Sequence, residues 1–118
     1  MKLITKEIAR QLDKNYLDPN KDEVLPAVKF FHPMNYKCIW LISERDPKDH
    51  DLLFGLCDLG MGFPELGYVR LSQLEDSKVM GLGVERALYW TPTQTLKGLA
   101  YGAKRLGSVR LCMEISGE

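Results

Sequence analysis

The chain has 118 residues, 45% of them hydrophobic and 27% charged, a balance that is ordinary for one globular domain and excludes a disordered chain. Lys and Arg number 16, and Asp and Glu also number 16, so the formal net charge is zero. A general nucleic-acid binder would be basic overall and a protein mimic of DNA strongly acidic, so the neutral balance argues against both classes.

The sequence predicts a cytoplasmic protein without a membrane partner. Charged residues follow Met1 before any apolar stretch forms, and no run approaches the ~18 apolar residues that a membrane helix needs. Cys38, Cys57 and Cys112 are odd in number and widely spaced, which fits neither a disulfide framework nor a zinc site. We therefore expect free, buried thiols in a reducing compartment, and neither a metal nor another cofactor.

The first half of the chain predicts one helix and three strands. Thr5 is a suitable N-cap for a helix that carries Ile4, Ile8 and Leu12 on one face and ends at residues 18–20. Short polar turns then separate three apolar runs, which predict an antiparallel meander over residues 27–32, 38–43 and 52–57. The middle run is nearly all apolar, which is typical of a central strand covered on both faces.

Trp40 lies in that central run, so we expect it to be buried. If the following turn centres on Lys48, Trp40 lies beside Gly55 and Cys57 of the next strand. The large ring would then cover the bare backbone of Gly55, which explains a glycine within a strand.

The second half predicts a fourth strand, two helices and an edge strand. A strand is expected over residues 65–70, followed by a short helix in which Ser72 and Glu75 have the capping-box spacing. Residues 95–106 predict a helix that Gly107 ends, and strict alternation over residues 109–115 predicts a half-buried edge strand. The predicted fold class is α+β, a single domain over residues 1–118: a mostly antiparallel sheet with a central three-stranded meander and helices near both ends packed on it.

Several short motifs, taken in order, resemble a small bacterial family catalogued only as domain of unknown function 2958. They are LITKEI at residues 3–8, VKFF at 28–31, Trp40 with Glu44 and Asp46, FGL at 54–56, ELGY at 65–68, Leu71 through Glu75, GVER at 83–86 and YWTP at 89–92. The resemblance covers about residues 1–92, which leaves the C-terminal helix and edge strand at 93–116. It implies a cytoplasmic accessory protein of mobile DNA, because members are typically carried on conjugative plasmids, integrated elements and phages. It supplies no activity, and Ala87 stands where many members carry an acidic residue.

The turn over residues 44–51 is the densest group of ionisable side chains. Glu44 and Asp46 alternate with Arg45, and with Glu65 from another strand they would offer three carboxylates to a divalent ion or for proton transfer. The alternative is a solvated hairpin turn whose charges keep it out of the core. Charged hairpins are much commoner than metal sites, so we favour the alternative.

Glu85 and Arg86 form a second candidate, between a glycine pair and an aromatic pair. Arg86 would clamp a carboxylate or phosphate, with Glu85 orienting it or acting as a base. A structural ion pair is the alternative that we favour, because a single ion pair is a weak functional signal. Tyr68, Tyr89 and Trp90 would form an aromatic platform for a base or a partner protein, although two of the three are expected in the core.

A basic stretch follows, since residues 87–113 contain no acidic residue. Lys97, Tyr101 and Lys104 share one face of the predicted helix and Arg105 adjoins it, a pattern typical of a phosphate-tracking surface. The alternative is a solvated helix face with lysine stems over apolar surface, which the neutral net charge favours.

Two functions remain. We favour a non-enzymatic accessory binding protein of a mobile genetic element that docks on another macromolecule, with a protein as the expected partner and nucleic acid as a weaker alternative. The second is a small metal-dependent hydrolase or nuclease that uses Glu44, Asp46 and Glu65. The two are separated by whether those carboxylates meet in one pocket.

Overall fold

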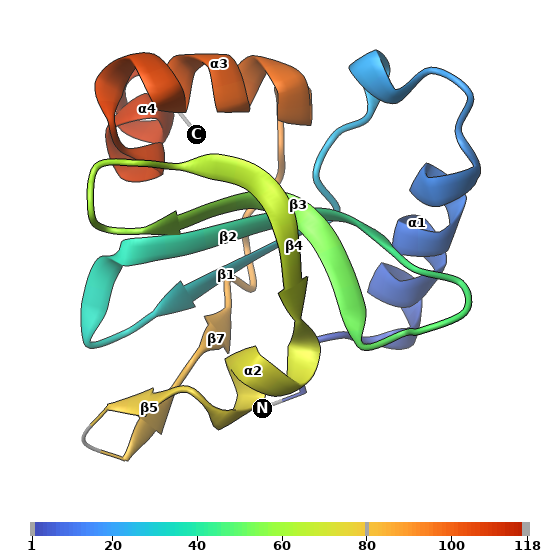
Figure 1. The fold of residues 1–118 in the computed structure, drawn as a ribbon, viewed down its shortest axis with the longest axis horizontal. Helices are drawn as coiled ribbons and strands as arrows, with labels where there is room; N and C mark the ends of the chain where they lie inside the picture. Colours follow the sequence, from blue (N-terminus) through green and yellow to red (C-terminus); the bar gives the residue numbers. More distant parts are fainter. Residues whose placement is uncertain (1, 80, 117–118) are drawn as a thin grey trace.

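The centre of the molecule is a five-stranded antiparallel sheet with strand order β4-β3-β2-β1-β7. The computed structural model describes residues 2–79 and 81–116. The first three strands form the predicted antiparallel meander with β2 in the middle, and β4 extends it by pairing with β3 (Figure 1). The strands are β1 (Val28–His32), β2 (Asn35–Arg45), β3 (Leu52–Leu59), β4 (Glu65–Arg70) and β7 (Glu85–Arg86).

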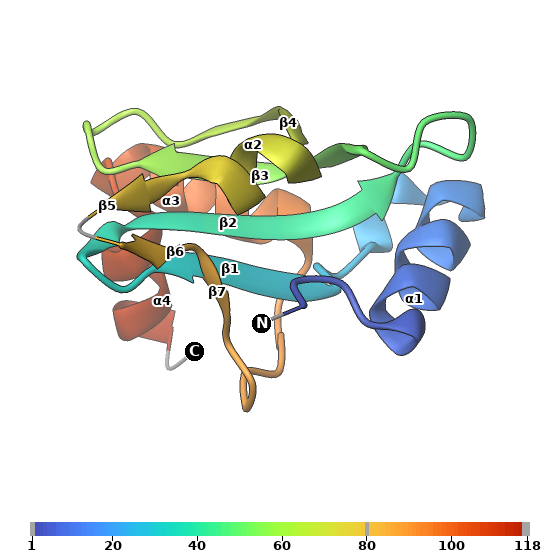
Figure 2. The same ribbon diagram turned by 90° about the horizontal axis from the view of Figure 1, so that it is seen from below.

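Helices lie on both faces of the sheet, which confirms the α+β class (Figures 1 and 2). One face carries α3 and α4, and the other carries the N-terminal segment and α2, with α1 beside the end of the sheet. Within the described ranges, no helix has the length and apolar character needed to cross a membrane. The remaining elements are α1 (Lys6–Leu17), η1 (Lys21–Glu23), α2 (Leu71–Asp76), the hairpin of β5 (Lys78–Val79) and β6 (Leu82–Gly83), α3 (Leu96–Leu106) and α4 (Val109–Ser116).

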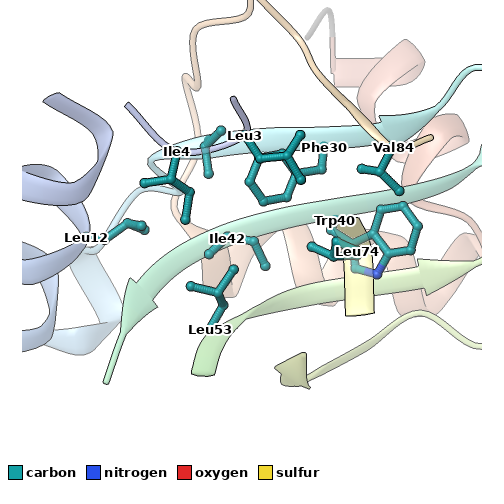
Figure 3. Close-up of a cluster of buried hydrophobic side chains, with 10 residues drawn as sticks. Leu3, Ile4, Leu12, Phe30, Trp40, Ile42, Leu53, Leu74 and Val84 are labelled. Carbon is teal, nitrogen blue, oxygen red and sulfur yellow. The ribbon is translucent and has the colours of Figure 1, made fainter. Parts of the chain in front are cut away.

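The face next to α1 and α2 holds one apolar cluster (Figure 3). Thr5 caps α1, because its hydroxyl accepts a hydrogen bond from the Ile8 N–H at 3.2 Å. Trp40 is 6% exposed, which confirms that it belongs to the core. The cluster comprises Leu3, Ile4, Leu12, Val28, Phe30, Trp40, Ile42, Leu53, Leu74 and Val84.

The opposite face holds a second cluster beneath α3 and α4. Thr95 caps α3 by accepting from the Gly98 N–H at 3.1 Å, and Gly107 in the left-handed conformation ends the helix, as predicted. The two helices approach closely at Gly102, where an added Cβ would lie 2.7 Å from the Cys112 sulfur. This cluster comprises Ile39, Leu41, Leu56, Leu96, Leu99, Ala100, Ala103, Val109, Cys112 and Met113.

The predicted edge strand over residues 109–115 is wrong, because this segment is the helix α4. Val109, Cys112 and Met113 are buried, a spacing of three and four, while Leu111 and Ile115 are exposed. The period-two pattern arises only if Cys112 is counted as polar. Counted as a small apolar residue, Cys112 completes a helical stripe.

The expected reason for Gly55 is also wrong. Trp40 does pair with Cys57, but Gly55 pairs with Ile42. A Cβ on Gly55 would lie 2.1 Å from the Leu41 carbonyl oxygen and 2.7 Å from the Ile42 Cα. Close approach of the β2 backbone therefore requires this glycine, rather than cover by an aromatic ring.

Ser72 is not the N-cap of α2, which begins at Leu71. The Ser72 N–H and hydroxyl both donate to the Asp51 carboxylate, at 2.9 and 2.8 Å. The first turn of α2 is thus held by a carboxylate from the β2–β3 turn, 21 residues away in the chain.

Candidate functional site: a groove beside an open sheet edge

A β-bulge in β2 decides where Glu44 points. Ile42 pairs with Gly55 and Glu44 with Phe54, so Ser43 is an extra residue. Paired residues of neighbouring strands share a face, and Phe54 packs against the cluster beneath α3. Glu44 therefore lies on the α3 face. Without the bulge, it would lie on the α1 face.

The bulge is fixed by a buried amide of α1. The Asn15 side-chain nitrogen donates to the Ser43 carbonyl at 3.0 Å and to the Leu25 carbonyl at 3.2 Å. Arg45, the next residue, lies on the α1 face, where it forms a two-point ion pair with Asp13 at 2.7 and 3.0 Å. Glu44 and Arg45 therefore lie on opposite faces of the sheet, and the Asn15–Ser43 hydrogen bond and the Arg45–Asp13 ion pair hold them there.

Two hollows follow the space between α3 and β4, and we call them together the α3–β4 groove. They measure about 300 and 320 Å³ and share Leu66 in their walls. The larger part of the first hollow's lining surface is apolar, although Ser43, Glu44 and three other polar or charged residues also line it. The lining residues are Lys21, Asp22, Val24, Ser43, Glu44, Phe54, Leu66, Leu96 and Lys97 for the first hollow and Pro64, Glu65, Leu66, Ala100 and Lys104 for the second.

Two large side chains extend this surface along β4. Leu66 is 45% exposed and Tyr68 is 69% exposed. The Tyr68 ring meets the Phe54 ring edge-on, with centroids 5.1 Å apart. The groove therefore continues into an exposed apolar and aromatic strip on the outermost strand.

The backbone of β4 has an open side. Its register with β3 continues to Leu71, whose N–H donates to the Asp51 carbonyl at 2.8 Å. Antiparallel ladders alternate, so Glu65, Gly67 and Val69 bond to β3, while the intervening residues direct their backbone groups away from the sheet. The outward N–H of Arg70 donates to the Gln73 side-chain oxygen at 3.1 Å. Among the described residues, the outward N–H groups of Leu66 and Tyr68 have no such side-chain acceptor. In Figure 2, β4 runs along the outer rim of the molecule.

The two lysines at the start of the groove each have a carboxylate beside them. Lys21 lies 3.4 Å from the Glu44 carboxylate, whose side chain is 17% exposed. Lys97 lies 3.2 Å from Asp22, and both side chains are about two-thirds exposed, so solvent screens this pair. Lys104 has no ion-pair partner within residues 2–79 and 81–116. Lys97 and Lys104 thus lie on the α3 side of the groove, while the carboxylates of Asp22, Glu44 and Glu65 balance the three lysines of its lining.

The three carboxylates of the hydrolase hypothesis do not meet. Glu44 is level with Phe54 and Glu65 with Cys57, a separation of about 10 Å along the strands and about 10 Å across them. The Asp46 carboxylate accepts from the Lys48 and Asp49 N–H groups and shapes the turn. In the part of the chain that the structure describes, no group of three or more His, Cys, Asp or Glu side chains could hold a metal ion.

The rest of the acidic turn is structural. A hydrogen bond from Arg70, at 2.9 Å, holds the pKa of Asp49 below its ordinary value. The hydrogen bonds from Ser72 lower the pKa of Asp51. These carboxylates join the turn to the β4–α2 junction, a role that neither sequence hypothesis anticipated.

The thiols offer no nucleophile. Cys112 is buried as expected, whereas Cys38 and Cys57 are half-buried. Burial raises the pKa of the Cys57 thiol to about 11, and burial together with the Asp58 charge raises the pKa of Cys38. Both thiols therefore stay protonated near neutral pH.

The other predicted binding residues lie apart from the groove. Glu85 and Arg86 form the short edge strand β7, paired with Phe31 and Phe30, and Arg86 donates to the Lys2 carbonyl. Trp90 is half-buried against the α3 face, but Tyr89 is 98% exposed. With Tyr68 also exposed, the expectation that two of these three aromatic residues are core is wrong.

The basic face of α3 is divided along its length. Lys97 lies at the start of the groove and Lys104 at its far end. Tyr101 and Arg105 instead contact each other near the α3–α4 turn, where the Arg105 guanidinium carbon lies 5.9 Å from the centre of the Tyr101 ring. Sequence reasoning missed Phe54 and Leu66 as site residues, two of the apolar residues that line the groove. The exposure of Leu66 follows only from the edge position of β4, which no local pattern reveals.

A hollow of about 430 Å³ between α1 and the β2–β3 turn is a weaker candidate. Its only guanidinium, from Arg45, is engaged by Asp13, and its lysines, Lys2 and Lys6, are exposed.

One family model matches most of this domain. The family described as protein of unknown function (DUF2958) matches residues 3–110, most of the chain. The chain belongs to the DUF2958 family. The match extends past the motifs at residues 1–92 and includes the whole of α3, so the α3–β4 groove lies within the DUF2958 domain. No curated protein and no solved structure matches the chain.

Proposed function

We propose that this protein is a non-enzymatic binding module that accepts an extended segment of a partner protein as an additional strand on β4. The observation that carries the proposal is the outward backbone of Leu66 and Tyr68 directly beside the α3–β4 groove. Addition of a strand to a sheet edge uses the backbone for affinity and neighbouring pockets for specificity.

The edge lacks the usual protection against such pairing. Natural edge strands are blocked by proline, lysine, bulges or covering segments. Between its charged end residues, Glu65 and Arg70, β4 has no proline and no charged side chain, and its register with β3 is regular. Only its last outward N–H, that of Arg70, is satisfied, by Gln73.

The groove favours a particular ligand chemistry. Side chains of an added strand that point to the α3 face would meet Leu66 and Tyr68 on one side and Lys97 and Lys104 on the other. Apolar side chains complement Leu66 and Tyr68, whereas the charges of the lining balance, since Lys21, Lys97 and Lys104 accompany Asp22, Glu44 and Glu65. The partner segment is therefore an extended peptide with apolar side chains at alternate positions, on the face that meets Leu66 and Tyr68.

The cellular setting belongs to the proposal as well. Three free cysteines favour a reducing compartment, and we place the protein in the bacterial cytoplasm. The motifs shared with the family support an accessory role in a mobile genetic element, a plasmid or a phage. The hydrolase alternative has little support, because Glu44, Asp46 and Glu65 lie apart from one another.

Selection of random linear peptides displayed on phage, followed by calorimetry with the synthetic peptide, tests the proposal. Leu66→Pro removes an outward N–H without removing a β3 ladder bond, so we expect at least a ten-fold loss of affinity. Leu66→Ala removes only the side chain and serves as the matched control, with a smaller loss. Tyr68→Lys is a second edge variant if Leu66→Pro does not fold. Peptides that bind wild type and both edge variants equally would overturn the proposal, as would a selection that yields no binder.

A further inference from the structure

The end of the molecule around the α3–α4 turn carries two arginine–tyrosine pairs. The Arg105 guanidinium lies 5.9 Å from the centre of the Tyr101 ring, and that of Arg110 lies 5.1 Å from the Tyr36 ring. One pair lies within α3, and the other joins α4 to the β1–β2 hairpin. Figures 1 and 2 both show α4, this hairpin and the β3–β4 loop at the same end.

The rings at this end are turned to solvent. Tyr36 is 61% exposed, Tyr101 70% and Phe63, in the β3–β4 loop, 79%. This loop touches the turn directly, since an added Cβ on Gly107 would lie 3.3 Å from the Gly62 carbonyl oxygen. A hollow of about 220 Å³ between them has Lys37 and Arg110 in its wall.

The charge exposed at this end is positive. Three cations, those of Lys37, Arg105 and Arg110, and two carboxylates, those of Glu114 and Asp58, lie at this end. Glu114 forms an ion pair with Arg110 at 2.6 Å. Asp58 is 1% exposed and accepts backbone hydrogen bonds from Gly60 and Val109, so its charge is directed inward. This end of the molecule is therefore basic, although the net charge of the whole chain is zero.

We propose that this end binds single-stranded nucleic acid through Tyr36, Lys37, Phe63, Tyr101, Arg105 and Arg110. Aromatic rings provide stacking surfaces for unpaired bases, and the neighbouring cations contact the phosphates. Arginine planes against the tyrosines add cation–π attraction. A duplex does not expose its base faces, so single strands are the preferred ligand. This surface is separate from β4 and does not depend on the peptide proposal.

Fluorescence anisotropy with labelled oligothymidylate at low salt tests the inference. We expect a dissociation constant in the micromolar range and a slope of about −2 in log affinity against log salt, because three cations are available. Tyr36→Ala with Tyr101→Ala should weaken binding about ten-fold for each ring while the net charge stays the same. Tyr89→Ala, a fully exposed tyrosine elsewhere, should change nothing.

Charge variants provide the second comparison. Lys37→Glu with Arg105→Glu should abolish binding, whereas Lys6→Glu with Lys14→Glu, on exposed positions of α1, changes the net charge equally and should retain it. Thermal melting checks that each variant is folded. The inference is overturned if wild type does not bind at low salt, if a duplex of the same length binds as tightly, or if the control variants lose as much affinity as the test variants.

Discussion

The carboxylate of Asp58, near the end of β3, accepts a hydrogen bond from the backbone N–H of Val109, the first residue of α4, at 2.9 Å. Its other oxygen accepts from the Gly60 N–H at 2.8 Å. Asp58 is 1% exposed, so one buried side chain joins the sheet to the start of α4 and to the β3–β4 loop. A carboxylate at this position also complements the positive end of the helix.

Asp58→Ala should lower the free energy of unfolding by about 2–4 kcal/mol, because it leaves two N–H groups without their acceptor. Asp58→Asn keeps one oxygen and should cost about half as much. Urea denaturation measures both. Asp76→Ala, at an exposed position at the end of α2, is the control. A midpoint for Asp58→Ala equal to that of wild type would show that α4 is held by its apolar contacts alone.

Two glycines that face each other across β3 and β4 should respond differently to alanine. Gly55 pairs with Gly67, but a Cβ on Gly55 would overlap the Leu41 carbonyl, while one on Gly67 meets nothing within 4 Å. Gly55→Ala should therefore destabilise by about 3 kcal/mol or more, and Gly67→Ala by less than about 0.5 kcal/mol. Comparable melting temperatures for the two variants would refute the close approach of β2.

Acid should weaken the contact between α1 and β2. The hydrogen bond from Arg45 lowers the pKa of Asp13 below its ordinary value of 3.8. A carboxyl whose pKa is lower in the folded state stabilises it above the unfolded pKa, and this contribution is lost as the pH falls through the folded pKa. Asp13→Asn should thus cost about 0.5–1 kcal/mol near neutral pH, since Asp13 is partly exposed, and should reduce the loss of stability below about pH 4.

Denaturation of both proteins at several pH values measures this difference. The variant retains the acid sensitivity of Asp49 and Asp51, whose pKa values are also lowered. Parallel stability curves for wild type and Asp13→Asn would contradict a role for Asp13 in that sensitivity.

Divalent cations should not bind to the acidic turn. Asp46, Asp49 and Asp51 use their oxygens for backbone, arginine and serine contacts within the fold. Calorimetric titration with Mg²⁺, Mn²⁺ or Ca²⁺ should therefore give no heat beyond dilution. Tight binding that Asp46→Ala removes would restore the hydrolase hypothesis.

The sequence predicted those elements whose burial pattern is local. The meander was predictable because its apolar runs and polar turns agree with a single pairing order. The helices α1 and α3 were predictable because the residues that end each helix agree with the limits of its apolar stripe. The segment at 109–115 was mispredicted because Cys112 fits either period. Its environment, the close approach to Gly102 of α3, determines which period applies.

The site was less predictable, because it depends on long-range geometry. Glu44 was singled out from its charge, yet its position results from the bulge at Ser43, which Asn15 of α1 fixes. The ELGY motif was singled out, but that β4 is an edge strand follows from the order of the whole sheet. Tyr89 is exposed because the chain leaves the sheet after Ala87, whose N–H still donates to the Lys29 carbonyl of β1, and composition does not show this.

Backbone amide hydrogen exchange at Leu66 and Tyr68, with and without a peptide selected for binding, tests the central claim most directly. Both amides point away from β3, so in the free protein they should exchange fast relative to Gly67 and Val69. A peptide that adds to β4 should slow both amides by at least ten-fold and leave β7 unchanged. Saturating peptide that leaves Leu66 and Tyr68 in fast exchange would contradict strand addition on β4.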